Sequence, residues 1–202
     1  MRDQFIKAVL FDFGGVRAEE RSINGLVAMA REQGLDEAAM PLTTMQAVYD
    51  SGFVLGRGTA DDFWDLLSDR TGLKGEHEAL TKRVLDGFIL RPWMMDLVRQ
   101  LSAQGYVTGI LSDQTYWLDW LDEQYHFKDA FDHVFISYYL GKGKQDVSLF
   151  SDVAARLALL PSELLFVDDN ADNVARARKA GLQVIQYIDR ESFFAEIERL
   201  TG

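Results

Sequence analysis

The sequence predicts an α/β protein with a doubly wound parallel sheet, and three observations support this fold class. Short apolar runs recur along the chain, several of them end at an acidic or hydroxyl-bearing residue, and segments with helical spacing lie between them. Short apolar runs are typical of parallel strands that are buried on both faces. Strands that alternate with helices indicate parallel βαβ units, so the pattern favours a sheet covered by helices on both sides.

The first predicted strand covers residues 8–11, an Ala-Val-Leu-Phe run that leads into an aspartate and two glycines. Two later runs have the same form, at residues 106–111 and 164–167. Residues 134–136 and 183–187 are further strand candidates. These five runs are the strands that we expect in the sheet.

Polar residues directly follow three of the predicted strands. Asp12 follows the first, Ser112 and Asp113 follow the second, and Asp168 and Asp169 follow the third. The carboxyl ends of parallel strands meet at one edge of the sheet, where doubly wound folds bind ligands. We therefore expect these polar side chains to converge on one site.

Two predicted helices flank the strands. Residues 93–103 have helical spacing ahead of the second strand, with Gly105 as a stop signal. Residues 171–180 have helical spacing after the third strand and end at Gly181. Glycine directly after a helical pattern is a common C-terminal signal, because it adopts the left-handed conformation without strain.

Residues 17–90 lack strand-like runs, and apolar residues there recur at helical spacing. Two stripes are visible, namely Ile23, Leu26, Val27 and Ala30, and then Phe63, Trp64, Leu66 and Leu67. Thr59, with Asp62 three residues later, is a predicted N-cap for the second stripe. We predict a helical insertion over residues 17–90 that interrupts a sheet domain of residues 1–16 and 91–202, with Pro92 marking the return to the sheet.

Composition limits the function classes that the chain can serve. The chain has 202 residues, 48% of them hydrophobic, which suffices for a substantial core. A formal net charge of −11, with no cluster of Lys and Arg, argues against nucleic acid and anionic membranes as partners. A small anionic substrate would therefore need a local positive charge or a bound cation.

The chain contains no cysteine, which excludes disulfides, thiolate catalysis and cysteine-ligated zinc, and which fits a reducing compartment. Asp12 interrupts the apolar run near the start, and no segment approaches the ~18 apolar residues of a membrane span. We expect a soluble, cytoplasmic protein. The sequence leaves its oligomeric state open.

The polar residues resemble, in order, the four sequence motifs of the haloacid dehalogenase-like hydrolases. In that family the motifs are a nucleophilic aspartate after a strand, a Ser or Thr after a strand, a lysine before a helix, and an acidic pair after a strand. The matching segments here are Val-Leu-Phe-Asp12-Phe-Gly14-Gly-Val, Gly-Ile-Leu-Ser112, Leu-Gly-Lys-Gly-Lys144 and Leu-Phe-Val-Asp168-Asp169. The resemblance covers nearly the whole chain, and it favours Lys144 over Lys142 as the motif lysine.

The resemblance implies a Rossmann-like core with a helical cap between the first and second motifs. It also implies a magnesium-dependent phosphatase that acts on a small phosphorylated metabolite. Sugar-phosphate phosphatases of the helical-cap branch are similar, since their first motif often has the form Asp-x-Gly-x-Val.

The same resemblance implies a role for each motif residue. Asp12 would be the nucleophile, and Mg²⁺ would bind to Asp12, to the backbone carbonyl of Gly14 and to Asp169. Ser112 would donate a hydrogen bond to the phosphate, and Lys144 would face both the phosphate and Asp12. Asp168 would pair with Lys144 or orient it. A carboxylate that attacks a phosphate dianion needs such positive charge, because like charges repel.

Three positions depart from the family pattern. Gly14 stands where relatives have a second aspartate, the general acid and base. Asp113, predicted with Ser112 and Lys144 to bind the substrate, stands where many relatives have a neutral Asn; a carboxylate there repels phosphate unless it is protonated, turned away or paired. Gln145 stands where a proline commonly follows the lysine, which affects the stiffness of the loop more than the chemistry.

The departures keep other functions open. A non-catalytic phosphate-binding protein fits Gly14 and Asp113, and a phosphomutase fits less well because the acid/base aspartate is missing. Carbon–halogen hydrolysis needs no metal and is disfavoured by the acidic pair.

The sequence does not identify the substrate. Glu19, Glu20 and Arg57 are candidates for substrate contact within the insertion. Trp117 and Trp120 are expected on the packing face of a helix, and a position of Tyr116 and Trp117 at the mouth of the substrate site is the alternative.

Overall fold

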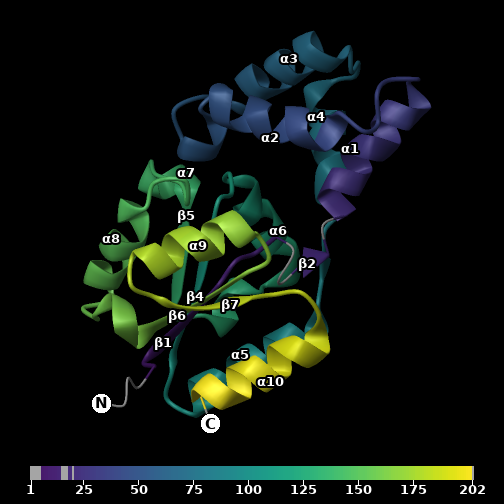
Figure 1. Cartoon of the computed structure of the whole chain (residues 1–202). Coiled ribbons are helices and arrows are strands. Elements are labelled where there is room, and N and C mark those ends of the chain that lie inside the picture. Colours follow the sequence, from purple (N-terminus) through teal and green to yellow (C-terminus); the bar gives the residue numbers. More distant parts are fainter. Residues whose placement is uncertain (1–5, 15–17, 20, 202) are drawn as a thin grey trace.

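The computed structural model describes residues 6–14, 18–19 and 21–201, and Figure 1 shows their arrangement. Five strands, all parallel to their neighbours, form one sheet in the order β5-β4-β1-β6-β7. The strands are β1 (Ala8–Phe11), β4 (Val107–Ser112), β5 (His133–Ile136), β6 (Leu164–Asp168) and β7 (Gln183–Gln186). This order confirms the predicted doubly wound α/β fold.

Strand β1 lies at the centre of the sheet and is fully buried. Its last residue, Phe11, pairs with Ile110 on β4 and with Val167 on β6. The Asp12 amide then donates to the Val167 carbonyl at 2.8 Å, so the ladder holds the first residue beyond the strand. Successive side chains of a strand point to opposite faces. Val9 and Phe11 accordingly belong to one core cluster and Ala8 and Leu10 to another.

Helices cover both faces of the sheet. α5 (Pro92–Ala103) and α10 (Arg190–Thr201) pack against the face that carries Val9 and Phe11. α8 (Ser148–Arg156) and α9 (Ala171–Lys179) pack against the opposite face. The sheet unit also contains α6 (Trp117–Tyr125), the short α7 (Ser137–Leu140) and the 3-10 turns η2 (Lys128–Ala130) and η3 (Pro161–Glu163).

Four helices form a group beyond the carboxyl ends of the strands (Figure 1). They are α1 (Arg21–Glu32), α2 (Met40–Asp50), α3 (Ala60–Thr71) and α4 (His77–Leu85), with the 3-10 turn η1 (Phe53–Leu55) between α2 and α3. We call α1–α4 with η1 the helical segment. A two-stranded antiparallel pair, β2 (Ala18–Glu19) with β3 (Ile89–Leu90), connects it to the sheet. The domain boundaries at residues 16, 17, 90 and 91 stay a prediction.

The predicted N-cap of α3 is confirmed. Thr59 Oγ1 accepts a hydrogen bond from the Asp62 amide at 3.1 Å, and Asp62 Oδ2 accepts one from the Thr59 amide at 2.8 Å. This reciprocal pair satisfies two of the amides that a helix start leaves free. It explains why α3 begins at Ala60.

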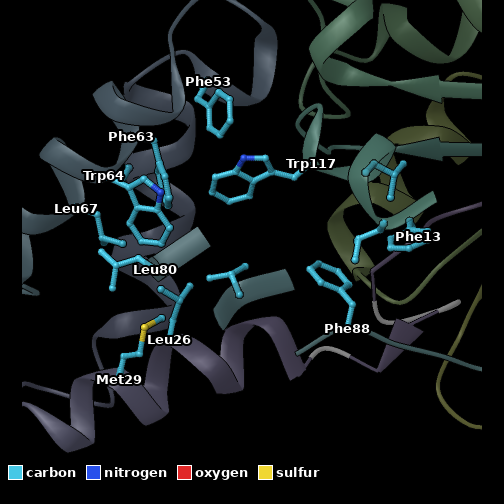
Figure 2. Close-up of a cluster of buried hydrophobic side chains, with 14 of the residues drawn as sticks. Phe13, Leu26, Met29, Phe53, Phe63, Trp64, Leu67, Leu80, Phe88 and Trp117 are labelled. Atoms are coloured by element: carbon cyan, nitrogen blue, oxygen red, sulfur yellow. The ribbon is translucent and has the colours of Figure 1, made fainter. Parts of the chain in front are cut away.

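Aromatic side chains join the helical segment to the sheet unit (Figure 2). The ring of Trp117 on α6 lies 5.2 Å from that of Phe53 and 5.9 Å from that of Trp64. The ring of Phe88, from the connection after α4, lies 5.9 Å from that of Phe13. All five belong to one buried cluster, so the two parts of the chain share a core.

The expectation that Trp120 packs inward is wrong, because 45% of this residue is exposed. Trp117, Leu118 and Leu121 form the buried face of α6, and Trp120 lies outside that stripe.

Within the described ranges, no helix combines the length and the apolar character needed to cross a bilayer.

Candidate active site

The polar residues predicted to converge lie at the carboxyl ends of three adjacent strands. Asp12 follows β1, Ser112 ends β4, and Asp168 ends β6. Ser112 Oγ donates to Asp12 Oδ1 at 2.7 Å and accepts from the Phe13 amide at 3.3 Å. The predicted bond from Ser112 to a phosphate oxygen stays a prediction, and the observed partner of its hydroxyl is the Asp12 carboxylate. Its bond from the Phe13 amide fixes the residue beside Asp12.

Lys144 brings a buried positive charge to the same place. Its Nζ donates to Asp12 Oδ1 at 2.7 Å and to Asp168 Oδ2 at 2.7 Å, and only 3% of the residue is exposed. The pairing with Asp168 is the one that the sequence analysis expects. Lys142 instead contacts Asp152 near the surface. Lys144 is therefore the lysine that faces the carboxylates.

Asp113 holds the backbone of Lys144. The Lys144 amide donates to both carboxylate oxygens of Asp113, at 2.9 and 3.2 Å. The Tyr49 hydroxyl, from the last turn of α2, donates to Asp113 Oδ2. Asp113 is thus a paired carboxylate. Its predicted contact with substrate stays a prediction, and its observed partners are a backbone amide and a residue of the helical segment.

Gly143 lets this loop come close to Asp113 and Tyr49. A Cβ at position 143 would lie 3.1 Å from the Tyr49 hydroxyl oxygen and 3.3 Å from each carboxylate oxygen of Asp113. Contacts of that length are tighter than side chains normally make, so a larger residue would displace the bonded groups. The sequence assigns no role to either residue, because Tyr49 lies outside the motifs and Gly143 is simply the residue before the motif lysine.

The carboxylates of Asp12, Asp168 and Asp169 form an acidic cluster. One oxygen from each lies within 4.8 Å of the others. Asp168 is fully buried, and it accepts from the Asn170 amide at 2.8 Å and from Asn173 Nδ2 at 3.2 Å, in addition to Lys144. Asp169 is half-buried. Oxygen ligands in this arrangement suit a hard divalent cation.

Burial and neighbouring charges shift the pKa values of three groups at the site. Burial raises the pKa of Asp12 to about 7, and the neighbouring charge of Asp168 adds to this while Lys144 opposes it. Burial, followed by the charge of Asp168, also raises the pKa of Asp169. For Lys144, burial lowers the pKa, but the charges of Asp12 and Asp168 outweigh it and raise the pKa overall. The site therefore favours additional positive charge.

A cavity of about 670 Å³ opens between the strand ends and the helical segment. The strand ends, the loops after them and α9 supply its polar lining, namely Asp12, Gly14, Ser112, Asp113, Gln114, Thr115, Lys144, Gln145, Asp168, Asp169, Asn170, Asp172, Asn173 and Arg176. Its opposite end contains apolar side chains of the helical segment and of α6, including that of Trp117. The cavity therefore includes every residue of the predicted site. Trp117 lines it as well as packing in the core, so the two interpretations of this residue are compatible.

Two residues of the cavity lining each have a buried polar atom with no hydrogen-bond partner among the described residues. These atoms are the Thr44 hydroxyl oxygen on α2 and the Trp117 indole nitrogen on α6. Most buried polar groups in proteins are paired, so such atoms need an explanation. Both belong to the apolar end of the cavity.

The predicted substrate contacts of the insertion have mixed outcomes. Glu20 and the side chain of Glu19 lie outside the described residues. Arg57 Nη2 donates to the Gly141 carbonyl at 2.8 Å, and Arg57 is not among the cavity residues. Arg57 therefore joins the helical segment to the turn after α7.

The chain matches a family model described as haloacid dehalogenase-like hydrolase over residues 6–181. It is similar to a sesquiterpene phosphatase of Aspergillus oryzae, with 28% identity over 199 residues and 97% of each chain covered. It is also similar to a D-ribitol-5-phosphate phosphatase of Bacteroides thetaiotaomicron, with 26% identity over 198 residues and 90% and 91% of the two chains covered.

Solved structures have the same fold. A predicted HAD-like family hydrolase from Porphyromonas gingivalis superposes with a TM-score of 0.75 at 26% identity, covering 97% of this chain and 98% of that one. A HAD family enzyme from Bacteroides thetaiotaomicron, in complex with magnesium and inorganic phosphate, has a TM-score of 0.72 at 21% identity, covering 94% and 99%. At 21% identity the likeness shows the fold alone.

The bond between Tyr49 and Asp113 predicts a stability difference between two matched variants. Tyr49→Phe removes a donor to a partly buried carboxylate, and we expect it to lower the free energy of unfolding by about 1.5–3 kcal/mol. Tyr139→Phe removes the same kind of bond, to Asp119, but Tyr139 is 64% exposed, so we expect less than about 0.5 kcal/mol. Urea unfolding measures both. Equal losses would mean that Tyr49 adds no specific stability.

Proposed function

Because the chain belongs to the haloacid dehalogenase-like hydrolases, we propose that it is a magnesium-dependent phosphatase in which Asp12 attacks a small phosphorylated metabolite. The observation that carries the proposal is the contact between Lys144 and Asp12 in the wall of the cavity. Lys144 Nζ lies 2.7 Å from Asp12 Oδ1, with the acidic cluster beside them. A carboxylate, an ammonium and a cation site around one cavity are the parts that phosphoryl transfer needs.

The donor set fits Mg²⁺. Three carboxylates lie within 4.8 Å of one another, and Mg²⁺ prefers oxygen ligands with several waters retained. Asp12 and Asp169 would hold the ion with their side chains, and Gly14 with its backbone carbonyl. Asp168 fits less well as a ligand, because Lys144, Asn170 and Asn173 already occupy its oxygens. When bound, Mg²⁺ would neutralise charge on the phosphoryl group.

In the proposed first step, an oxygen of Asp12 forms a bond to phosphorus while the bond from phosphorus to the ester oxygen breaks. The leaving alkoxide takes a proton from solvent water and departs as the alcohol, and Asp12 becomes an aspartyl-phosphate. Ser112 Oγ and Lys144 Nζ, which contact Asp12 Oδ1 in this structure, donate to the phosphoryl oxygens. In the second step, water attacks phosphorus, loses a proton and releases inorganic phosphate, which restores Asp12.

Asp113 acts in this proposal as a positioning residue. It accepts from the Lys144 amide, so it fixes the loop that carries the ammonium toward Asp12. Its negative charge is engaged by that amide and by Tyr49, which reduces its repulsion of a phosphate. Burial and the charge of Asp113 raise the pKa of Tyr49, so the phenol stays protonated as a donor.

A second candidate, a non-catalytic phosphate-binding protein, is favoured by Gly14 alone, since glycine cannot transfer a proton. A panel of phosphate esters with Mg²⁺ decides between the two. Turnover that Asp12→Asn abolishes supports the phosphatase. Phosphate binding without turnover of any ester supports the binding protein.

We predict that Asp12→Asn abolishes turnover and leaves the fold intact. An amide is a far weaker nucleophile than a carboxylate. We expect kcat to fall by much more than tenfold, which corresponds to about 1.4 kcal/mol. Steady-state kinetics measures the fall, and circular dichroism checks the fold. A smaller loss would remove Asp12 from the nucleophile role.

A further prediction is that Mg²⁺ raises the melting temperature. At a concentration of about 100 times Kd, a ligand adds about 2.7 kcal/mol, or about 5–10 °C for a chain of this size. Asp169→Asn is expected to reduce this shift more than Asp168→Asn, because Asp168 is occupied by Lys144 and Asn173. Thermal unfolding with and without Mg²⁺ measures it. A larger loss of the Mg²⁺-induced shift in Asp168→Asn than in Asp169→Asn would make Asp168 the metal ligand in place of Asp169.

Gly14 predicts a steep dependence of the rate on the leaving group. Positioned proton transfer contributes roughly 100- to 10,000-fold, and Gly14 cannot provide it. Acyl and aryl phosphates, whose leaving groups need little protonation, are therefore expected to transfer fastest to Asp12. Single-turnover rates over esters of graded leaving-group pKa measure the dependence, and Gly14→Asp is expected to flatten it. A flat series for the unchanged protein would show that another group supplies the proton.

A further inference from the structure

The helical segment supplies an almost wholly apolar wall to the cavity. Among the described residues that it contributes, only Thr44 and Tyr49 carry a polar atom in the side chain. The Tyr49 hydroxyl is already engaged by Asp113. The rest of this wall is aliphatic or aromatic, with Leu26, Phe63 and Val84 among its buried members. We call these cavity residues of the helical segment the apolar wall.

The opposite side of the same space is also apolar. α6 contributes Trp117, Leu118 and Leu121, and the connection after α4 contributes Phe88. Figure 2 shows Trp117 and Phe88 on the side of the cluster that faces the sheet, with Phe63 across from them on α3. Apolar side chains therefore surround the part of the cavity that lies away from Asp12.

This lining is poorly suited to a sugar or a polyol. Each hydroxyl that leaves water needs a hydrogen-bond partner in the site, since an unpaired buried polar group is costly. The apolar wall carries two hydroxyls, of which that of Tyr49 is engaged by Asp113 and that of Thr44 is buried away from solvent, as is the Trp117 indole nitrogen across from it. The hydroxyls of a pentitol chain that lay against this wall would therefore find few partners there.

We propose that the substrate is a phosphate monoester of a hydrocarbon-rich alcohol, and this inference rests on the phosphatase function proposed above. The phosphate lies at the strand ends against Ser112 and Lys144, and the hydrocarbon group lies between the apolar wall and α6. A cavity of about 670 Å³ is within the range that encloses a drug-sized ligand. Burial of the apolar surface of this organic group then favours hydrocarbon-rich substrates over polar ones.

Unbranched alkylphosphonates test the inference directly, because their carbon–phosphorus bond is not hydrolysed and the unchanged protein can be used. Calorimetry with Mg²⁺ present compares methyl-, butyl-, hexyl- and octylphosphonate. We expect affinity to rise about two- to fourfold with each methylene, the span that transfer from water allows. A polyhydroxylated phosphonate of the same length is expected to bind no better than methylphosphonate. A flat series, or equal binding of the polyol, would overturn the inference.

Two exposed apolar residues on α2, Met45 and Leu42, provide a matched pair of variants. Met45 lines the cavity and is 51% exposed, so Met45→Glu places a charge at the apolar wall without disturbing the core. Leu42 lies three residues earlier, is 64% exposed and is not among the cavity residues. We expect Met45→Glu to flatten the chain-length series and to weaken octylphosphonate binding at least tenfold. Leu42→Glu is expected to leave the series unchanged, and equal effects of the two would contradict the assignment.

A separate measurement keeps this inference distinct from the proposed function. Turnover of acetyl phosphate by the unchanged protein, compared with Asp12→Asn, tests the phosphatase reaction on a substrate too small to reach the apolar wall. Absence of that turnover overturns the phosphatase. The phosphonate series depends on binding alone, so it decides the nature of the organic group in either case.

Discussion

The buried ammonium of Lys144 lies between the carboxylates of Asp12 and Asp168, and the arrangement of the sheet depends on this cluster. A buried charge without its partner is strongly destabilising, by about 3–5 kcal/mol. The three residues come from the ends of β1 and β6 and from the loop before α8. Strands β1 and β6 must therefore be neighbours in one register, because a shift of either strand would leave a charge without a partner.

Much of the fold could be predicted because the sequence signals were local. Parallel strands buried on both faces are apolar throughout, so the runs at residues 8–11 and 164–167 stood out. The N-cap at Thr59 could be predicted because a capping box is a pattern of two residues. The family motifs added Lys144, which periodicity alone would not have distinguished from Lys142. Helix ends and strand ends differed from expectation by about one residue.

The parts that sequence could not give depend on how distant segments pack. Tyr49 lies 64 positions from Asp113 and carries no motif, so only the placement of α2 over the strand ends reveals their contact. Trp117 and Trp120 look alike in sequence, yet one is buried and the other is exposed, because the buried stripe runs through Trp117, Leu118 and Leu121 and Trp120 lies about 60° beyond its edge. Leu26 and Phe63 follow the spacing of any amphipathic helix. Nothing in that spacing distinguishes a core side chain from one that lines a cavity.

The separate origins of the two ends of the cavity have an evolutionary consequence. The groups proposed for the chemistry come from the sheet unit, whereas the apolar wall comes from an insertion between β1 and β4. Substitutions in the insertion can therefore change which organic group is accepted while the phosphoryl chemistry is retained. Tyr49 is the exception, because its bond to Asp113 reaches the loop of Lys144. A lineage that diversifies its substrates through this insertion is free to vary Met45 and Val48, but a change at Tyr49 alters the reaction centre as well.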